Sequence, residues 1–243
     1  MKKIFFNADD LGLTHGVNVG IVDCYNKGVV NSASLMTTTP YFEEAVSLIK
    51  EHLLDNIGLH FNLTEFQPLL TTHKTIVDEN GFFFRTICDK NNIDLKEVAA
   101  ELEAQYQRAV TAGVVITHFD SHHHVHMSEL LKKVFLKMAV KYALPLRKVP
   151  NEYRNPVKWL KHFRLFKDHC FYTDSFSSEF YDGAISINVL EKIITNAKGS
   201  LEIMCHPGHV DAENGVYDLQ RQLEIDVLTS DEIINLLYPK SKQ

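Results

Sequence analysis

The sequence predicts an α/β protein in which parallel strands are covered by helices. Strand-like and helix-like segments alternate along the 243 residues, and 45% of the residues are hydrophobic, enough for a substantial core. Histidines and aspartates follow several of the strand-like segments. Barrels and open parallel sheets both carry their chemistry at the carboxyl ends of the strands. The polar residues at the strand ends are therefore the candidates for function.

The strands are predicted from short apolar runs, and the helices from apolar residues three or four positions apart. The first strand is residues 3–8, and the first helix is residues 16–25, ending near Gly28. The further predicted strands are residues 33–38, 57–63, 113–117, 144–149 and 201–205. The further predicted helices are residues 42–53, 94–110, 128–142, 185–197 and 231–237.

Residues 64–92 interrupt this alternation and show few regular patterns. Asn80-Gly81, flanked by apolar residues, is typical of a hairpin turn. A long irregular segment between regular elements is often an active-site loop or a lid. The sequence leaves open whether this segment is a lid.

Composition limits the classes of protein. The 25 basic and 31 acidic residues give a net charge of −6, whereas a nucleic-acid partner would call for a basic patch. No run approaches the roughly 20 apolar residues that cross a bilayer, and no secretory signal is evident. Cys24, Cys88, Cys170 and Cys205 are far apart, as expected of reduced thiols in a cytoplasmic protein. We expect a single domain, residues 1–243.

The first strand ends in an acidic pair, Asp9 and Asp10. Two adjacent carboxylates after an apolar strand cost free energy unless they are paired, hydrogen-bonded or metal-bound. A helix N-terminus would account for one of them and leave the other without a role. The pair therefore favours a functional site. His60 and His206 also lie at strand ends, but a lone histidine in an apolar strand is more often a core residue than a ligand.

Residues 118–126 contain five histidines and Asp120. Neutral imidazole is the commonest protein ligand for a metal, although a solvated histidine-rich loop or histidines buried in the core would give the same pattern. If the strand continues, Asp120 and His122 share one face. If the chain turns helical, His122 and His126 share a face. In either case only some of these imidazoles can reach one point.

One aspartate and two histidines from separate strand ends would form a mixed nitrogen and oxygen ligand set. Such a set suits zinc or another first-row divalent ion. A carboxylate beside a ligand can act as general base, and a histidine as general acid. These parts suit a hydrolase of an amide or an ester, and they do not name its substrate.

Four segments together resemble the YdjC-like carbohydrate deacetylases, in particular the chitooligosaccharide deacetylase group. They are Asn7 to Asp10, Gly58 to Thr64, Thr117 to His126, and His206-Pro207. The third segment is the most specific, and the four span the chain from residue 7 to about residue 208.

The resemblance implies a β/α barrel of seven or eight strands, regular or distorted, and removal of N-acetyl groups from acetylated amino sugars or chitooligosaccharides. It implies one magnesium or zinc ion and a homodimer. By position, the implied metal ligands are Asp10, His60 and His122. Asp9 matches the general base and His206 the general acid. The side chains expected to bind substrate or orient the ligands are His124, His126 and Asp120.

Two rival functions remain open at this point. One is a metal-dependent amidase or esterase that acts on a different substrate. The other is a metal- or sugar-binding protein without turnover. Asp9 argues against a binding protein without turnover, because such a protein needs no second carboxylate beside a metal ligand.

Overall fold

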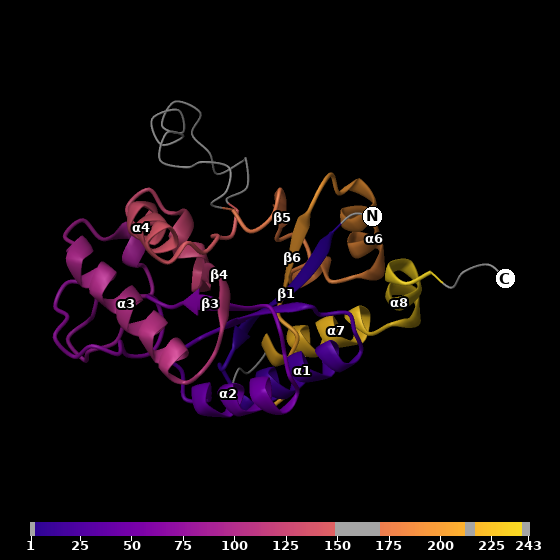
Figure 1. The fold of residues 1–243 in the computed structure, drawn as a ribbon, viewed down its shortest axis with the longest axis horizontal. Coiled ribbons are helices and arrows are strands. Elements are labelled where there is room, and N and C mark those ends of the chain that lie inside the picture. The colour runs from indigo at the N-terminus through magenta and orange to yellow at the C-terminus, as the bar shows by residue number, and fades with distance from the viewer. Residues whose placement is uncertain (1–2, 149–170, 212–216, 240–243) are drawn as a thin grey trace. The chain divides into compact units, whose positions relative to one another are not determined.

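The computed structural model describes residues 3–148, 171–211 and 217–239. Six strands occur in this part of the chain, and Figure 1 shows them among the helices. The strands are β1 (Ile4–Leu11), β2 (Ser32–Leu35), β3 (Ile57–Phe61), β4 (Ile116–Ser121), β5 (Ser175–Ser177) and β6 (Leu201–Cys205). The α-helices are α1 (His15–Asn26), α2 (Phe42–Glu51), α3 (Leu95–Thr111), α4 (Lys132–Tyr142), α6 (Ile187–Asn196), α7 (Tyr217–Leu228) and α8 (Asp231–Leu237).

The strand order is β4-β3-β2-β1-β6-β5. The registers are parallel, with Ile4 opposite Leu201 in the β1–β6 pair and His60 opposite Asp120 in the β3–β4 pair. The predicted α/β class with parallel strands is therefore confirmed. Over the described residues the order has two ends, β4 and β5, so the closed barrel stays a prediction. The strand predicted at residues 144–149 is reduced, where described, to isolated bridges made by Leu146.

The chain divides into two compact units. Unit 1 contains the described residues of 1–34, 40–56 and 173–243, and unit 2 those of 35–39 and 57–172. The expected single domain stays a prediction. No helix in either unit, as far as the chain is described, is long and apolar enough to cross a membrane.

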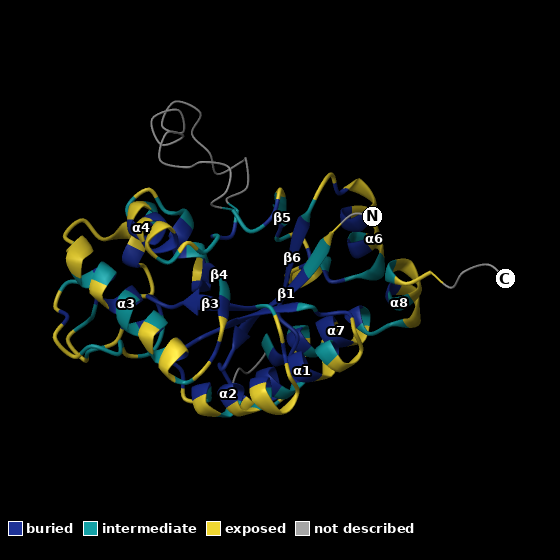
Figure 2. Cartoon of the chain, viewed as in Figure 1, coloured by how far each residue is buried: buried dark blue, intermediate teal, exposed yellow. Residues whose placement is uncertain are grey.

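Unit 1 is built on β1, whose last six residues are buried (Figure 2). Helix α1 packs against β1, α2 and α7. Thr14 begins α1, since its side chain accepts a hydrogen bond from the Val17 amide. A Cβ atom at Gly20 of α1 would lie 2.6 Å from the Gly208 Cα. The helix therefore lies directly on the chain that follows β6, and position 20 has no room for a side chain.

In unit 2, hydrogen bonds to a helix anchor part of the irregular segment 64–92. Helix α3 begins at Asp94, as predicted, and its buried face includes Glu101 and Gln105. The Glu101 carboxylate accepts hydrogen bonds from the Leu69 and Leu70 amides at 3.0 and 3.2 Å. Glu97 accepts from the amides of residues 74 and 75. This part of the irregular segment is consequently a fixed part of unit 2.

The turn predicted at Asn80-Gly81 is confirmed. Val77 and Phe83 form an antiparallel bridge, and the Asp78 amide donates to the Phe82 carbonyl at 2.8 Å. Gly81 has φ +80°, a left-handed conformation that glycine adopts without strain.

Three local features differ from the prediction. Strand β5 and helix α7 were not predicted, and α4 begins at Lys132 rather than near Ser128. The delay in α4 arises because His122–Met127 forms a separate 3₁₀ segment, η2. Apolar spacing does not predict helix α7, because its buried face carries the charged residues Asp218, Arg221 and Glu224.

Candidate active site

Asp9 is buried at the end of β1 and is oriented by Asn7. The Asn7 Nδ2 donates to Asp9 Oδ1 and to Ser34 Oγ, both at 2.8 Å. The Ser32 hydroxyl donates to Asn7 Oδ1 at 2.6 Å, so it fixes which way the amide points. Asn7 and Asp9 lie on the same side of the strand because side chains alternate. The predicted general base is thus held in one orientation.

Asp10 forms a buried ion pair with Arg221 of α7. The Arg221 Nη2 donates to Asp10 Oδ2 at 2.6 Å, and each side chain is 3% exposed. Burial lowers the pKa of Arg221, but Asp10 outweighs it, and the net pKa is raised. Asp10 has a left-handed φ of 70°. This backbone conformation is uncommon outside glycine, and its cost is tolerated at functional sites.

His206 follows β6 and contacts the same helix. Its amide donates to Glu224 Oε2, and its Nδ1 lies 3.7 Å from Glu224 Oε1. The Arg221 Nη1 donates to the His206 carbonyl at 3.4 Å. Arg221 therefore links the predicted ligand Asp10 to the predicted acid His206 within unit 1.

Arg221 and Glu224 were missed from the sequence. Their spacing could have revealed them, because Asp218, Arg221 and Glu224 lie three residues apart on one face of a helix. Ile225 and Leu228 share that buried face. Charges on the apolar face of a helix need partners, which points toward a buried polar site.

His60 is oriented by a buried carboxylate in unit 2. Its Nδ1 lies 2.8 Å from Asp120 Oδ1, and Arg147 Nη2 lies 2.7 Å from Asp120 Oδ2. Burial raises the pKa of Asp120, but Arg147 and His60 outweigh it and hold the pKa well below its usual range. The ionised Asp120 makes Nδ1 the donor, so the lone pair of His60 is on Nε2. Carboxylates commonly orient metal-binding imidazoles in this way.

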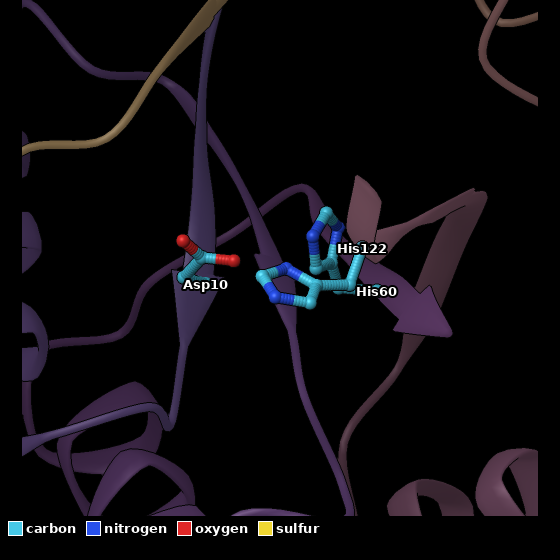
Figure 3. A group of neighbouring side chains, drawn as sticks. All are labelled: Asp10, His60 and His122. Carbon is cyan, nitrogen blue, oxygen red and sulfur yellow. The ribbon is translucent and has the colours of Figure 1, made fainter. Parts of the chain in front are cut away.

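The histidine run follows neither predicted geometry. Strand β4 ends at Ser121, and His123 and His124 in η2 have left-handed φ angles of 51° and 52°. The rings of His122 and His123 consequently lie against each other, with centroids 4.0 Å apart. His60 and His122 meet edge to face at 5.5 Å, as Figure 3 shows.

Glu65 is a second acidic residue that the sequence interpretation missed. Its Oε2 lies 3.3 Å from His122 Nε2, and Arg85 contacts its other oxygen. The hydrogen bond from His122 lowers the pKa of Glu65 to about 2, against the opposite effect of burial. Its position could have revealed it, because Glu65 directly follows the segment from Gly58 to Thr64 at the end of β3.

The other histidines of the run have different surroundings. His126 is buried, its Nδ1 lies 2.5 Å from Ser121 Oγ, and burial places its pKa well below 6.5. It is therefore neutral at pH 7. The His124 ring lies 6.1 Å from that of His126. The expected contribution of these two to substrate binding or ligand orientation stays a prediction.

His118 is a core residue. Its ring stacks on Tyr172 at 4.0 Å, and a Cβ atom at Gly58 would lie 2.4 Å from its Nε2. Glycine at position 58 therefore makes room for the buried ring.

The described residues thus contain groups of buried acidic and histidine side chains that could hold a metal ion. Unit 1 brings together Asp9, Asp10 and His206 around β1, β6 and α7. Unit 2 brings together His60, Asp120 and His122 at the ends of β3 and β4.

Known proteins resemble this chain over nearly its whole length. A protein named carbohydrate deacetylase from Thermoanaerobacter pseudethanolicus is 36% identical, covering 98% of this chain and 94% of that protein. Another of that name from Brevibacillus brevis is 34% identical, covering 99% and 96%.

Solved structures also match. A proposed cellobiose-phosphate cleavage protein from Enterococcus faecalis has a TM-score of 0.85 and 33% identity, covering 97% of this chain and 94% of that chain. The lactam utilization protein from Thermus thermophilus, at 15% identity and TM-score 0.51, covers 92% and 95% and shares the fold alone. The model of the YdjC-like proteins matches residues 3–238. The chain therefore belongs to the YdjC-like family.

Proposed function

We propose that the protein is a metal-dependent carbohydrate deacetylase that removes N-acetyl groups from acetylated amino sugars, with chitooligosaccharides as the substrate class to test first. The activity is supported by the names of the full-length relatives. The observation that carries the proposal is the Arg147–Asp120–His60 chain, which makes Nδ1 of His60 the donor and places the lone pair of the imidazole on Nε2. An imidazole buried only for packing has no need of an ionised carboxylate on Nδ1.

We propose Asp10, His60 and His122, drawn in Figure 3, as the ligands of one divalent ion. One carboxylate and two imidazoles match the donors that zinc and other first-row ions prefer, and magnesium would rely more on Asp10. A bound ion would polarise the acetyl carbonyl and lower the pKa of water.

The protein's own side chains then supply the proton transfers. Asp9 takes a proton from the attacking water, while Asn7 holds its Oδ1 in place. His206 gives a proton to the departing amine, and Glu224 positions it by accepting the hydrogen bond of its backbone amide. Arg221 holds Asp10 through a buried ion pair and donates to the His206 carbonyl.

The test is acetate release from N,N'-diacetylchitobiose and longer acetylated oligomers by the Asp9→Asn protein. We expect turnover to fall about 10²- to 10⁴-fold, the usual contribution of a general base. The content of bound magnesium, measured in parallel, should not change, whereas Asp10→Asn should lose the magnesium ion. Normal turnover by Asp9→Asn would exclude the assignment of the base. The homodimer also stays a prediction, which light scattering would test.

A further inference from the structure

A second set of metal-ligand side chains lies wholly within unit 2. It consists of Glu65, His122 and His123, whose ligand atoms all lie within 4.8 Å of one another. The proton transfers proposed above use neither Glu65 nor His123. His122, by contrast, is one of the proposed ligands of the catalytic ion. We call these three residues the Glu65 group.

The backbone brings the two rings of the Glu65 group to one side. Consecutive side chains of a strand point to opposite faces. The left-handed φ angles of His123 and His124 end that alternation and place the rings of His122 and His123 4.0 Å apart. Each such residue costs roughly 1–3 kcal/mol and persists only where the surroundings impose it.

The distances within the Glu65 group are close to those of a zinc centre. Two ligand atoms about 2.05 Å from a tetrahedral zinc ion lie about 3.3 Å from each other. Glu65 Oε2 lies 3.3 Å from His122 Nε2, and Glu65 Oε1 lies 4.0 Å from His123 Nε2. His123 Nε2 would have to move about 0.7 Å closer to Glu65 to reach that separation.

Neighbouring contacts hold these ligand atoms in place. Thr64 Oγ1 lies 2.9 Å from His123 Nδ1, which leaves Nε2 as the nitrogen near Glu65. Asn62 Oδ1 accepts from the Glu65 amide at 3.1 Å. Arg85 also contacts the Glu65 carboxylate, but its side chain is 69% exposed, so a metal ion would compete only with a solvated guanidinium.

We propose that the Glu65 group is a second divalent-cation site, suited to zinc, and that filling it withdraws His122 from the catalytic ion. Two imidazoles and one carboxylate favour zinc over magnesium. Excess zinc therefore inhibits the enzyme. The binding site depends on unit 2 alone, and only the inhibition rests on the proposed function.

Binding is tested by equilibrium dialysis of zinc against the Asp10→Asn protein, in which the catalytic ligand set is broken. We expect this protein to retain zinc. Adding Glu65→Gln and His123→Asn should weaken the remaining binding roughly tenfold or more, the scale on which even indirect changes weaken metal sites. Asparagine suits position 123 because it tolerates a left-handed backbone. Adding His52→Ala, an exposed histidine of unit 1, is the matched control and should leave binding intact. Unchanged zinc affinity in the protein with Glu65→Gln and His123→Asn would overturn the site.

Inhibition is tested by acetate release at rising zinc concentration. Wild-type turnover should fall once the Glu65 group fills, and Glu65→Gln and His123→Asn should each raise the inhibitory concentration roughly tenfold or more. Wild-type protein that binds the second zinc ion without losing activity would refute the inhibitory role. Normal metal binding and turnover by Asp10→Asn would show that the proposed catalytic ligand set is wrong. The dialysis experiment would still show whether the Glu65 group binds zinc.

Discussion

At the scale of single residues, His209 shows how the chain after β6 is attached. Its Nε2 lies 2.8 Å from Asp23 Oδ2 of α1, and its Nδ1 lies 3.0 Å from Gln222 Oε1 of α7. Both partners are acceptors, so only the charged imidazolium donates to both. Burial lowers the pKa of His209, but these hydrogen bonds outweigh it, and the net pKa is raised above 6.5.

This arrangement predicts a pH-dependent contribution to stability. Because the folded-state pKa is raised, the contribution is complete below about pH 6.5 and is lost as the pH rises through the folded-state value. Thermal unfolding of wild type and His209→Gln should therefore differ most near pH 6 and least near pH 9. The effect is modest because Asp23 is half exposed. A difference that grows with pH would contradict this, and His52→Gln serves as the control.

The sequence draws attention to polar side chains that follow a strand, but it does not reveal their partners that are distant in sequence. Asp9, Asp10 and His60 follow apolar strands, which makes them visible in the sequence. Arg147 and Arg221 lie 27 and 211 residues from the aspartates that they neutralise, Asp120 and Asp10. A single sequence holds no record of those pairings.

At the scale of elements, α3 and the irregular segment after β3 act as one piece. The buried carboxylate of Glu101 accepts from the amides of Leu69 and Leu70 and lies 3.0 Å from His73 Nε2. It also accepts from Gln105 at 2.9 Å. A glutamine at position 101 cannot replace this carboxylate, because the NH2 group of its side chain would face hydrogen-bond donors.

Glu101→Gln should therefore loosen this segment. We expect a loss of about 1–3 kcal/mol of unfolding free energy, the cost of leaving buried donors without an acceptor. Hydrogen exchange should accelerate at the amides of residues 69–73 and stay slow in α3. Lys96→Gln removes an exposed charge from the same helix and should leave the exchange unchanged. Equal acceleration in both variants would argue against the role of Glu101.

Elements with regular apolar spacing were predicted well, and those that lack it were not. The caps of α1, α3 and α6 lie close to the predicted starts, since Thr14, Asp94 and Ser186 each accept from the first turn. Strand β5 has only three residues and α7 buries charges, so neither carries an apolar pattern. The 3₁₀ segment η2 depends on backbone strain that periodicity does not encode.

At the scale of the whole molecule, metal binding should stabilise the folded chain, because the proposed ligands Asp10, His60 and His122 are far apart in sequence and come together only on folding. An ion at about 100 times its dissociation constant would add about 2.7 kcal/mol. For a chain of this size that corresponds to a rise of roughly 5–10 °C in Tm. With magnesium as the added ion, calorimetry should show the rise in wild type, its reversal by a chelator, and a much smaller rise in Asp10→Asn. An equal rise in both proteins would show that Asp10 is not a ligand.

The fold class and the chain order of most elements were predictable, because strand and helix periods differ. The division into two units was not, because residues 35–39 join unit 2 while residues on both sides belong to unit 1. Such interleaving depends on long-range contacts rather than on any local break in composition.

The anchoring of residues 69–75 to α3 also has a kinetic consequence. A lid must break its closing contacts in every catalytic cycle, and the buried amide bonds to Glu101 would make each opening slow. This stretch therefore stays in place while sugars bind and leave. Stopped-flow mixing with an acetylated oligosaccharide should accordingly show one binding phase whose rate rises linearly with sugar concentration, with no plateau set by an opening step.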